Sequence, residues 1–285
     1  MPATFTLRAS KLAALDDMSS NWNRFFNAQT RGYLKEHFMT AVAIPRIPAG
    51  PRQFDLHHQI ASGYKIARLA AWDATSADDE PLNGYWVPQG GSCVIPRFAM
   101  RSHYVFTPDF SGCSLLIDQI DRHHYRVYHA QASRAHLANE YLNPAGHRHG
   151  LGLAAALTFS DYSAACTACK TLCGREQTRG FAFLKFEDGR WWIYAQGQNG
   201  VGIGYADGRY TLNGPQTPSG GVRIPVADLT CDVPRTPERH DGVALPSVTR
   251  EALYANIAPA AGLYTRAKAR DAGIFTRMLP KEDRW

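Results

Sequence analysis

Cysteine is scarce in this 285-residue chain, and long hydrophobic runs are missing. The six cysteines are too few for the disulfide framework of a small secreted domain, so we expect reduced thiols. The longest weakly polar stretch, Leu151 to Phe159, is too short to cross a bilayer. The opening seventeen residues contain no continuous apolar core and no small-residue cleavage site, so no classical secretory signal is expected. The sequence predicts a soluble protein of a reducing cytosol, whose export would need a specialised secretion system.

Charge runs, internal repeats and low-complexity tracts are also absent. The formal net charge is +6 and the pI is about 9.0, but the basic residues are scattered through the whole sequence. This distribution is typical of a solvated surface and does not predict a nucleic-acid partner, although attraction to an acidic partner is the alternative. With 45% hydrophobic and 20% charged residues, the chain has the composition of a globular protein that buries a sizeable core.

Three cysteines are closely spaced, as Cys166-x-x-Cys169-x-x-x-Cys173. Thiolates bind zinc, but a structural zinc site needs four ligands and no fourth ligand is evident. The surrounding segment, Ser160 to Leu172, is rich in Ala and Thr and predicts a helix. On one face of that helix the cysteines pack as small apolar groups, so we predict that they bind no metal; zinc or redox chemistry is the alternative.

Prolines and glycines divide the chain near residue 50. Before them we expect an N-terminal helical segment over residues 1–50, with helices over Lys11 to Met18 and Trp22 to Met39. After them we expect an α+β domain over residues 51–285, which begins with a helix from Leu56 to Trp72.

The centre of the chain alternates apolar and polar residues and predicts an antiparallel, β-sandwich-like core wrapped by helices and loops. Asp188-Gly189 and Asp207-Gly208 are typical of tight hairpins. We also expect that a helix from Ser133 to Leu142 and an Ala-rich stretch from Ala154 to Cys173 interrupt the sheet, and that an irregular covering loop runs from Thr211 to Leu245. The expected strands are Cys93 to Phe106, Cys113 to Asp118, Tyr125 to Ala130, Phe181 to Phe186, Arg190 to Gln196, Val201 to Tyr205 and Arg209 to Leu212.

Catalytic chemistry is indicated by Cys113 and His129. If Cys113 begins one strand and His129 ends its antiparallel neighbour, a turn over residues 119–122 brings both to the same end of the hairpin. Imidazole beside a thiol takes its proton, and the thiolate attacks a carboxamide carbon. Thr107 is the expected third residue, which orients the imidazole through its hydroxyl or its carbonyl.

Several neighbours offer other readings of this pair. Asp109 and Asp118 are weaker candidates for orienting the imidazole, and an ordinary strand Cys and strand His is the non-catalytic alternative. Ser111-Gly112 permits close approach of a substrate carbonyl to backbone N–H groups near the cysteine. A rival turn, Gly91-Ser92-Cys93, is followed by His103. His123 and His124 are expected to be exposed turn residues.

The segment from Tyr104 to Gln131 resembles the catalytic segment of the bacterial glutamine deamidases typified by cytotoxic necrotizing factor and Burkholderia lethal factor. The resemblance lies in Ser111-Gly112-Cys113, in His129, and in Thr107 six residues before the cysteine. It implies a hydrolase of the toxin or effector type, active in virulence. Such a protein converts a glutamine side chain of a host protein to glutamate and needs no cofactor. We expect a monomer whose partner is that host substrate.

Two other classes of protein fit the same residues. A transglutaminase or a cysteine protease also uses a Cys-His pair, although papain-like enzymes place the nucleophile at a helix start. A non-enzymatic β-sandwich module would bind protein or glycan through exposed aromatics such as Trp191, Tyr194 and Tyr205.

Overall fold

The computed structural model describes residues 22–41, 44, 47–61, 64–72, 80–131, 139, 141, 149–158, 161–162, 179–199, 203–206, 209–212, 217–230 and 283–284. The helices predicted over Lys11 to Met18 and Ser133 to Leu142 lie wholly or almost wholly outside these residues. Cys166, Cys169 and Cys173 lie outside them as well.

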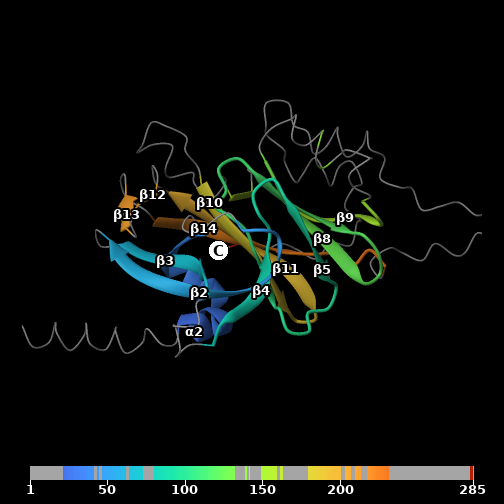
Figure 1. The fold of residues 1–285 in the computed structure, drawn as a ribbon, viewed down its shortest axis with the longest axis horizontal. Coiled ribbons are helices and arrows are strands. Elements are labelled where there is room, and N and C mark those ends of the chain that lie inside the picture. Colours follow the sequence, from blue (N-terminus) through green and yellow to red (C-terminus); the bar gives the residue numbers. More distant parts are fainter. Residues whose placement is uncertain are drawn as a thin grey trace, which may run out of the picture.

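Two β-sheets dominate the described part of the chain (Figure 1). The larger sheet has nine strands, in the order β1 (Phe38–Thr40), β3 (Tyr64–Ala71), β2 (Gly50–Ala61), β4 (Leu82–Trp86), β6 (Tyr104–Phe106), β10 (Arg179–Glu187), β11 (Arg190–Asn199), β14 (Thr217–Pro225) and β15 (Asp283–Arg284). The smaller sheet has four, in the order β5 (Ser92–Pro96), β8 (His124–Ala130), β7 (Ser114–Gln119) and β9 (Gly152–Leu157). A separate hairpin joins β12 (Ile203–Ala206) to β13 (Arg209–Leu212).

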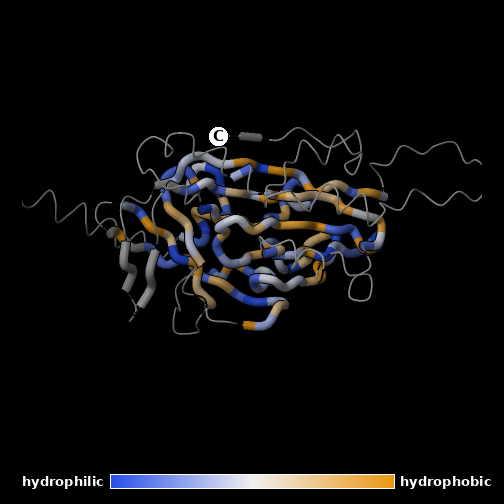
Figure 2. The backbone as a smooth tube through the Cα atoms, turned by 90° about the horizontal axis from the view of Figure 1, so that it is seen from above, coloured by the Kyte–Doolittle hydropathy of each residue, from blue (hydrophilic) through white to orange (hydrophobic). Residues whose placement is uncertain are grey.

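The main core lies between the two sheets. The small sheet contributes residues such as Ile95, Ile117 and Val127, and the large sheet contributes Leu184 and Ile193 among others. Figure 2 shows the hydrophobic segments that run through the stacked strands. Burying both inner faces stabilises the pair of sheets and fixes the strand register, because a one-residue slip would turn every inner side chain outward.

A second core lies on the opposite face of the large sheet. The short helices α2 (Trp22–Ala28) and α3 (Thr30–Glu36) cover it with Phe26, Tyr33 and Leu34. Figure 1 shows α2 beside β2. The fold is therefore α+β, as the sequence predicts: packed sheets with a helical segment near the N-terminus.

Some predicted elements are wrong. The helix expected from Leu56 to Trp72 is the hairpin of β2 and β3, in which Ala61 pairs with Tyr64. Ile66 and Ala67 are adjacent and both fully buried, so β3 is covered on both faces at these two positions and its burial does not alternate there. Two neighbouring buried residues followed by buried Leu69 match helical spacing, which explains the error.

Three further segments differ from the prediction. The Ala-rich run from Ala154 begins inside strand β9, all of whose residues are buried. The expected loop after Thr211 contains β14, which pairs with β11 around a register shift near Gln196. Gly220, with φ of 107°, lies opposite that shift, as expected for a bulge. The strand expected from Cys93 to Phe106 is two strands, β5 and β6, in different sheets.

The Asp188-Gly189 turn agrees with the sequence prediction. Both residues have positive φ, 52° and 74°, and they connect β10 to β11 as a two-residue hairpin. The expected helix from Trp22 to Met39 is shorter than predicted, because α3 ends at Glu36 and β1 begins at Phe38. β1 then pairs with β3, so the first fifty residues contribute a strand to the large sheet.

Candidate functional site

Cys113 and His129 lie at the same end of the β7–β8 hairpin. Ser114 pairs with Ala130 and Leu115 with His129, so Cys113, which directly precedes β7, is at the level of Gln131. Cys113, Leu115 and His129 share the inner face of the small sheet, where Cys113 and Leu115 belong to the main core. Cys113 and His129 are thus diagonal neighbours on one face, a relation in which Cα atoms lie about 7–8 Å apart.

Thr107 contacts His129 directly. Its Oγ1 lies 2.6 Å from His129 Nδ1 and donates a hydrogen bond to the carbonyl oxygen of Val87 at 2.7 Å. A hydroxyl has one proton, and a carbonyl can only accept. With that proton directed at Val87, Thr107 accepts from the imidazole, so Nδ1 carries the hydrogen. The neutral ring therefore keeps its lone pair on Nε2, the atom that would act as a base.

Phe110 fixes the plane of the imidazole. The two rings stack, with centroids 4.4 Å apart and an interplanar angle of 7°. The backbone of Phe110 in turn forms two hydrogen bonds with Gly180 of β10, at 2.7 and 3.0 Å. His129 is fully buried and is held by a hydroxyl, by an aromatic face and by its own strand. Sequence reasoning did not assign a role to Phe110, although the residue lies inside the motif.

Asp109 anchors the segment before the cysteine. Its carboxylate accepts hydrogen bonds from Ala41 N and Thr40 Oγ1, both at 2.7 Å, and lies 3.5 Å from Arg179. Burial raises the pKa of Asp109. The other acidic candidate, Asp118, accepts from Tyr141 Oη at 2.7 Å and lies 2.6 Å from His149 Nδ1. The structure thus brings Thr107, of the three candidates, to His129.

Tyr162 bridges the turn that enters β7. Its hydroxyl accepts a hydrogen bond from Gly112 N at 2.8 Å and donates one to the carbonyl of Cys113 at 3.1 Å. Gly112 has φ of 98°, which a glycine adopts readily. The Gly112 N–H, one of the backbone donors expected for an oxyanion, is thus bound to Tyr162 in this state. Sequence reasoning missed Tyr162, because it comes from a segment 49 residues further along the chain.

The rival cysteine, Cys93, lies further along the sheet, away from the end that carries Cys113. It pairs with Val127, whereas Cys113 is at the level of Gln131, so the two are separated by four residues, about 13 Å along the strands. Burial raises the pKa of Cys93, which disfavours its thiolate. His103 lies beside β6 of the other sheet. Neither Cys93 nor Cys113 forms a disulfide among the described residues.

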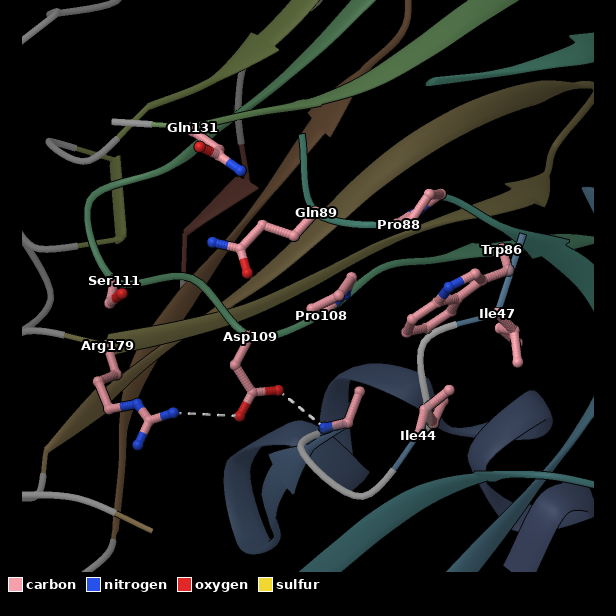
Figure 3. Close-up of a pocket in the computed structure, with 11 residues that line it drawn as sticks. Ile44, Ile47, Trp86, Pro88, Gln89, Pro108, Asp109, Ser111, Gln131 and Arg179 are labelled. Atoms are coloured by element: carbon pink, nitrogen blue, oxygen red, sulfur yellow. Dashed lines mark hydrogen bonds and ion pairs between the residues drawn. The ribbon is translucent and has the colours of Figure 1, made fainter. Parts of the chain in front are cut away.

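A cavity of about 700 Å³ opens at the end of the sheet where Cys113 lies (Figure 3). Ser111, two residues before the cysteine, and Gln131, two residues after the histidine, both line it. Cys113 itself is only 4% exposed, and His129 is fully buried. Each residue of the pair is therefore two positions along the chain from a residue that lines the cavity.

The remaining candidate residues have ordinary surroundings. His123 lies in the exposed turn, as expected, whereas His124 is the first residue of β8, partly exposed and paired with Asp121. Trp191 and Tyr194 are buried, at 1% and 5% exposure, so they do not form the aromatic binding surface that the module hypothesis requires. Trp192 is half-buried beneath the guanidinium of Arg223, 3.6 Å from its ring.

Comparison with family models finds no match for this chain, and no curated protein matches it. Among the described residues, no helix is long and apolar enough to span a membrane. Within the same residues, no group of three or more His, Cys, Asp or Glu side chains is placed to hold a metal ion.

Proposed function

We propose that the protein is a protein-glutamine deamidase, with Cys113 as the nucleophile and His129 as the base. The single observation that carries the proposal is the contact between Thr107 and His129, which leaves Nε2 as the basic atom of an imidazole on the same face as Cys113. A structural histidine does not need that tautomer, but a general base does.

The reaction proceeds in two steps. His129 takes the thiol proton, and the Cys113 thiolate attacks the carboxamide carbon of a glutamine side chain. The tetrahedral intermediate collapses to a thioester when the amide nitrogen takes the proton from His129 and leaves as ammonia. Water, deprotonated by His129, then attacks the thioester carbonyl and releases glutamate and the thiol. No cofactor takes part in these steps.

The burial of Cys113 and His129, each two positions along the chain from a cavity-lining residue, suits a side-chain substrate better than a backbone one. A glutamine side chain can extend past Ser111 and Gln131 towards the thiol, whereas a peptide bond would have to bring its whole backbone there. The resemblance of Ser111-Gly112-Cys113, Thr107 and His129 to the deamidase toxins supports a host protein as the substrate.

Incubation of the protein with a eukaryotic cell lysate tests the proposal. Peptide mass spectrometry is expected to find glutamines converted to glutamate by the wild-type chain and not by Cys113→Ser, which keeps nearly the same volume. Equal glutamate formation by the two chains would contradict the proposal. Peptide-bond cleavage or incorporation of amines in place of the acid would instead assign the pair to a protease or a transglutaminase.

A further inference from the structure

The cavity beside the catalytic pair has two chemically different ends. Figure 3 shows Trp86, Ile44 and Ile47 at one end, and Gln89, Gln131 and Ser111 at the other. The polar end contains Ser111 and Gln131, which lie two residues along the chain from Cys113 and from His129, respectively. The apolar end is further from the thiol and is walled by side chains that also pack on the second core.

Among the described residues that line the cavity, the charges are balanced. The two charged ones, Asp109 and Arg179, form an ion pair at 3.5 Å, and Asp109 is additionally held by the backbone N–H of Ala41. A site that selects a charged side chain would present an unmatched charge of the opposite sign. This cavity therefore favours a neutral occupant, and its apolar end favours a hydrophobic one.

The size of the cavity exceeds what one glutamine side chain requires. At about 700 Å³ it falls within the range of about 300–1,000 Å³ of sites that enclose whole ligands. Only the polar end is needed to guide a carboxamide towards Cys113. The space against Trp86 and Ile47 is thus left for a second group of the same substrate.

We infer that this apolar end is a specificity subsite for a hydrophobic side chain adjacent to the target glutamine. The inference rests on the proposed deamidase function. The glutamine enters past Ser111 and Gln131, the primary amides of Gln89 and Gln131 bind the polypeptide backbone, and the neighbouring leucine-like side chain is buried against Trp86, Ile44 and Ile47. The substrate class is a glutamine beside an aliphatic or aromatic residue.

The test uses matched synthetic peptides with one glutamine in a Gly/Ser background. The residues flanking the glutamine are leucine, lysine, glutamate or glycine. Ammonia release gives kcat/KM, and calorimetry with Cys113→Ser gives binding without turnover. We expect the leucine peptide to be turned over about tenfold more efficiently than the glycine peptide, the size of effect a hydrophobic pocket provides.

A charge in the subsite should redirect the preference. Ile47→Asp is expected to reverse the order, so that the lysine peptide becomes the best substrate and the leucine peptide loses its advantage. The matched control is Ile60→Asp, which places the same charge on an isoleucine that is already 69% exposed on β2. It should leave the wild-type order unchanged. If Ile47→Asp does not fold, Ile44→Ser is expected to reduce the leucine advantage.

Each outcome separates the subsite from the deamidase function. Ammonia released equally from all four peptides, or an order unaffected by the cavity variants, overturns the subsite and leaves the function standing. Tighter binding of the leucine peptide without any ammonia supports the subsite and overturns the function. Absence of both turnover and preferential binding overturns both.

Discussion

Replacement of Thr107 by valine isolates the role of one hydroxyl. Valine keeps the branched shape, but it removes the donor to Val87 O and the acceptor for His129 Nδ1–H, which lie 2.7 and 2.6 Å from Oγ1. The variant therefore lacks the hydrogen-bond acceptor that favours the Nδ1–H tautomer of His129. We expect the ring to redistribute towards the Nε2–H tautomer, in which Nε2 is a donor and no longer a base.

The size of the effect follows from burial. Thr107 is 1% exposed and His129 is fully buried, so the Val87 carbonyl and the His129 Nδ1–H cannot replace the lost hydroxyl with water. A buried polar group without a partner costs about 1–3 kcal/mol. For the two groups we expect a loss of stability of about 2–6 kcal/mol, and a fall in Tm of at least about 4 °C at about 2–4 °C per kcal/mol. Since general-base catalysis contributes about 10²–10⁴-fold, kcat/KM should fall at least about tenfold.

Nitrogen–proton correlation NMR of the His129 ring reads the tautomer without any substrate. The wild-type chain should show hydrogen on Nδ1, Thr107→Val should show a shift towards Nε2, and Thr107→Ser should restore the wild-type pattern and most of the activity. A neutral ring with hydrogen on Nε2 alone in the wild-type chain would refute the reasoning. So would a Thr107→Val chain that keeps the Nδ1–H signal and full ammonia release.

Three further variants probe the surroundings of the site and the packing of the helices. Cys93→Ser should keep most of the activity in the lysate assay, and a loss confined to this variant would transfer the nucleophile to the rival turn. Gly180→Ala would place a Cβ 2.9 Å from Cδ2 of Tyr162 and displace the ring from Gly112 and Cys113, so ammonia release and Tm should both fall; an unchanged chain would show that the tyrosine contacts are dispensable. Burial, followed by nearby His37 and His57, lowers the pKa of His58 to about 3, so its contribution to stability is present above the unfolded pKa of about 6.5 and is lost as pH falls towards 3. His58→Gln should therefore weaken the acid sensitivity of Tm, and an unaltered pH profile would contradict this.

The hairpin that carries the candidate pair was predictable because its signals are local. Ser111-Gly112 precedes a run of inward apolar residues, and a short polar turn returns the chain to His129, so the two ends of one hairpin were fixed by nearby residues. The Thr107–His129 contact could be anticipated from the motif. Its geometry depends on Val87, which belongs to a different segment, and periodicity does not reveal such a partner.

The errors arise where tertiary contacts override local pattern. β9 is buried on both faces, and β3 is so at Ile66 and Ala67, which removes the alternation that marks a strand. β14 contains prolines at positions 218 and 225 and two central glycines, and the sequence therefore reads as a loop. The prolines lie near its two ends and the glycines sit at the register shift, so the strand accommodates all of them. Tyr162 and Arg179 reach the site from segments distant in sequence.

The pH dependence of Cys113 alkylation tests the central claim most directly, because it requires no knowledge of the substrate. With iodoacetamide as the probe and peptide mass spectrometry as the readout, the account predicts that Cys113 reacts below neutral pH, faster than Cys93, which has no imidazole partner in the account, and that His129→Asn abolishes this low-pH reaction. Reaction of Cys113 only at alkaline pH, unchanged in His129→Asn, would show that no thiolate–imidazolium pair forms and would contradict the account.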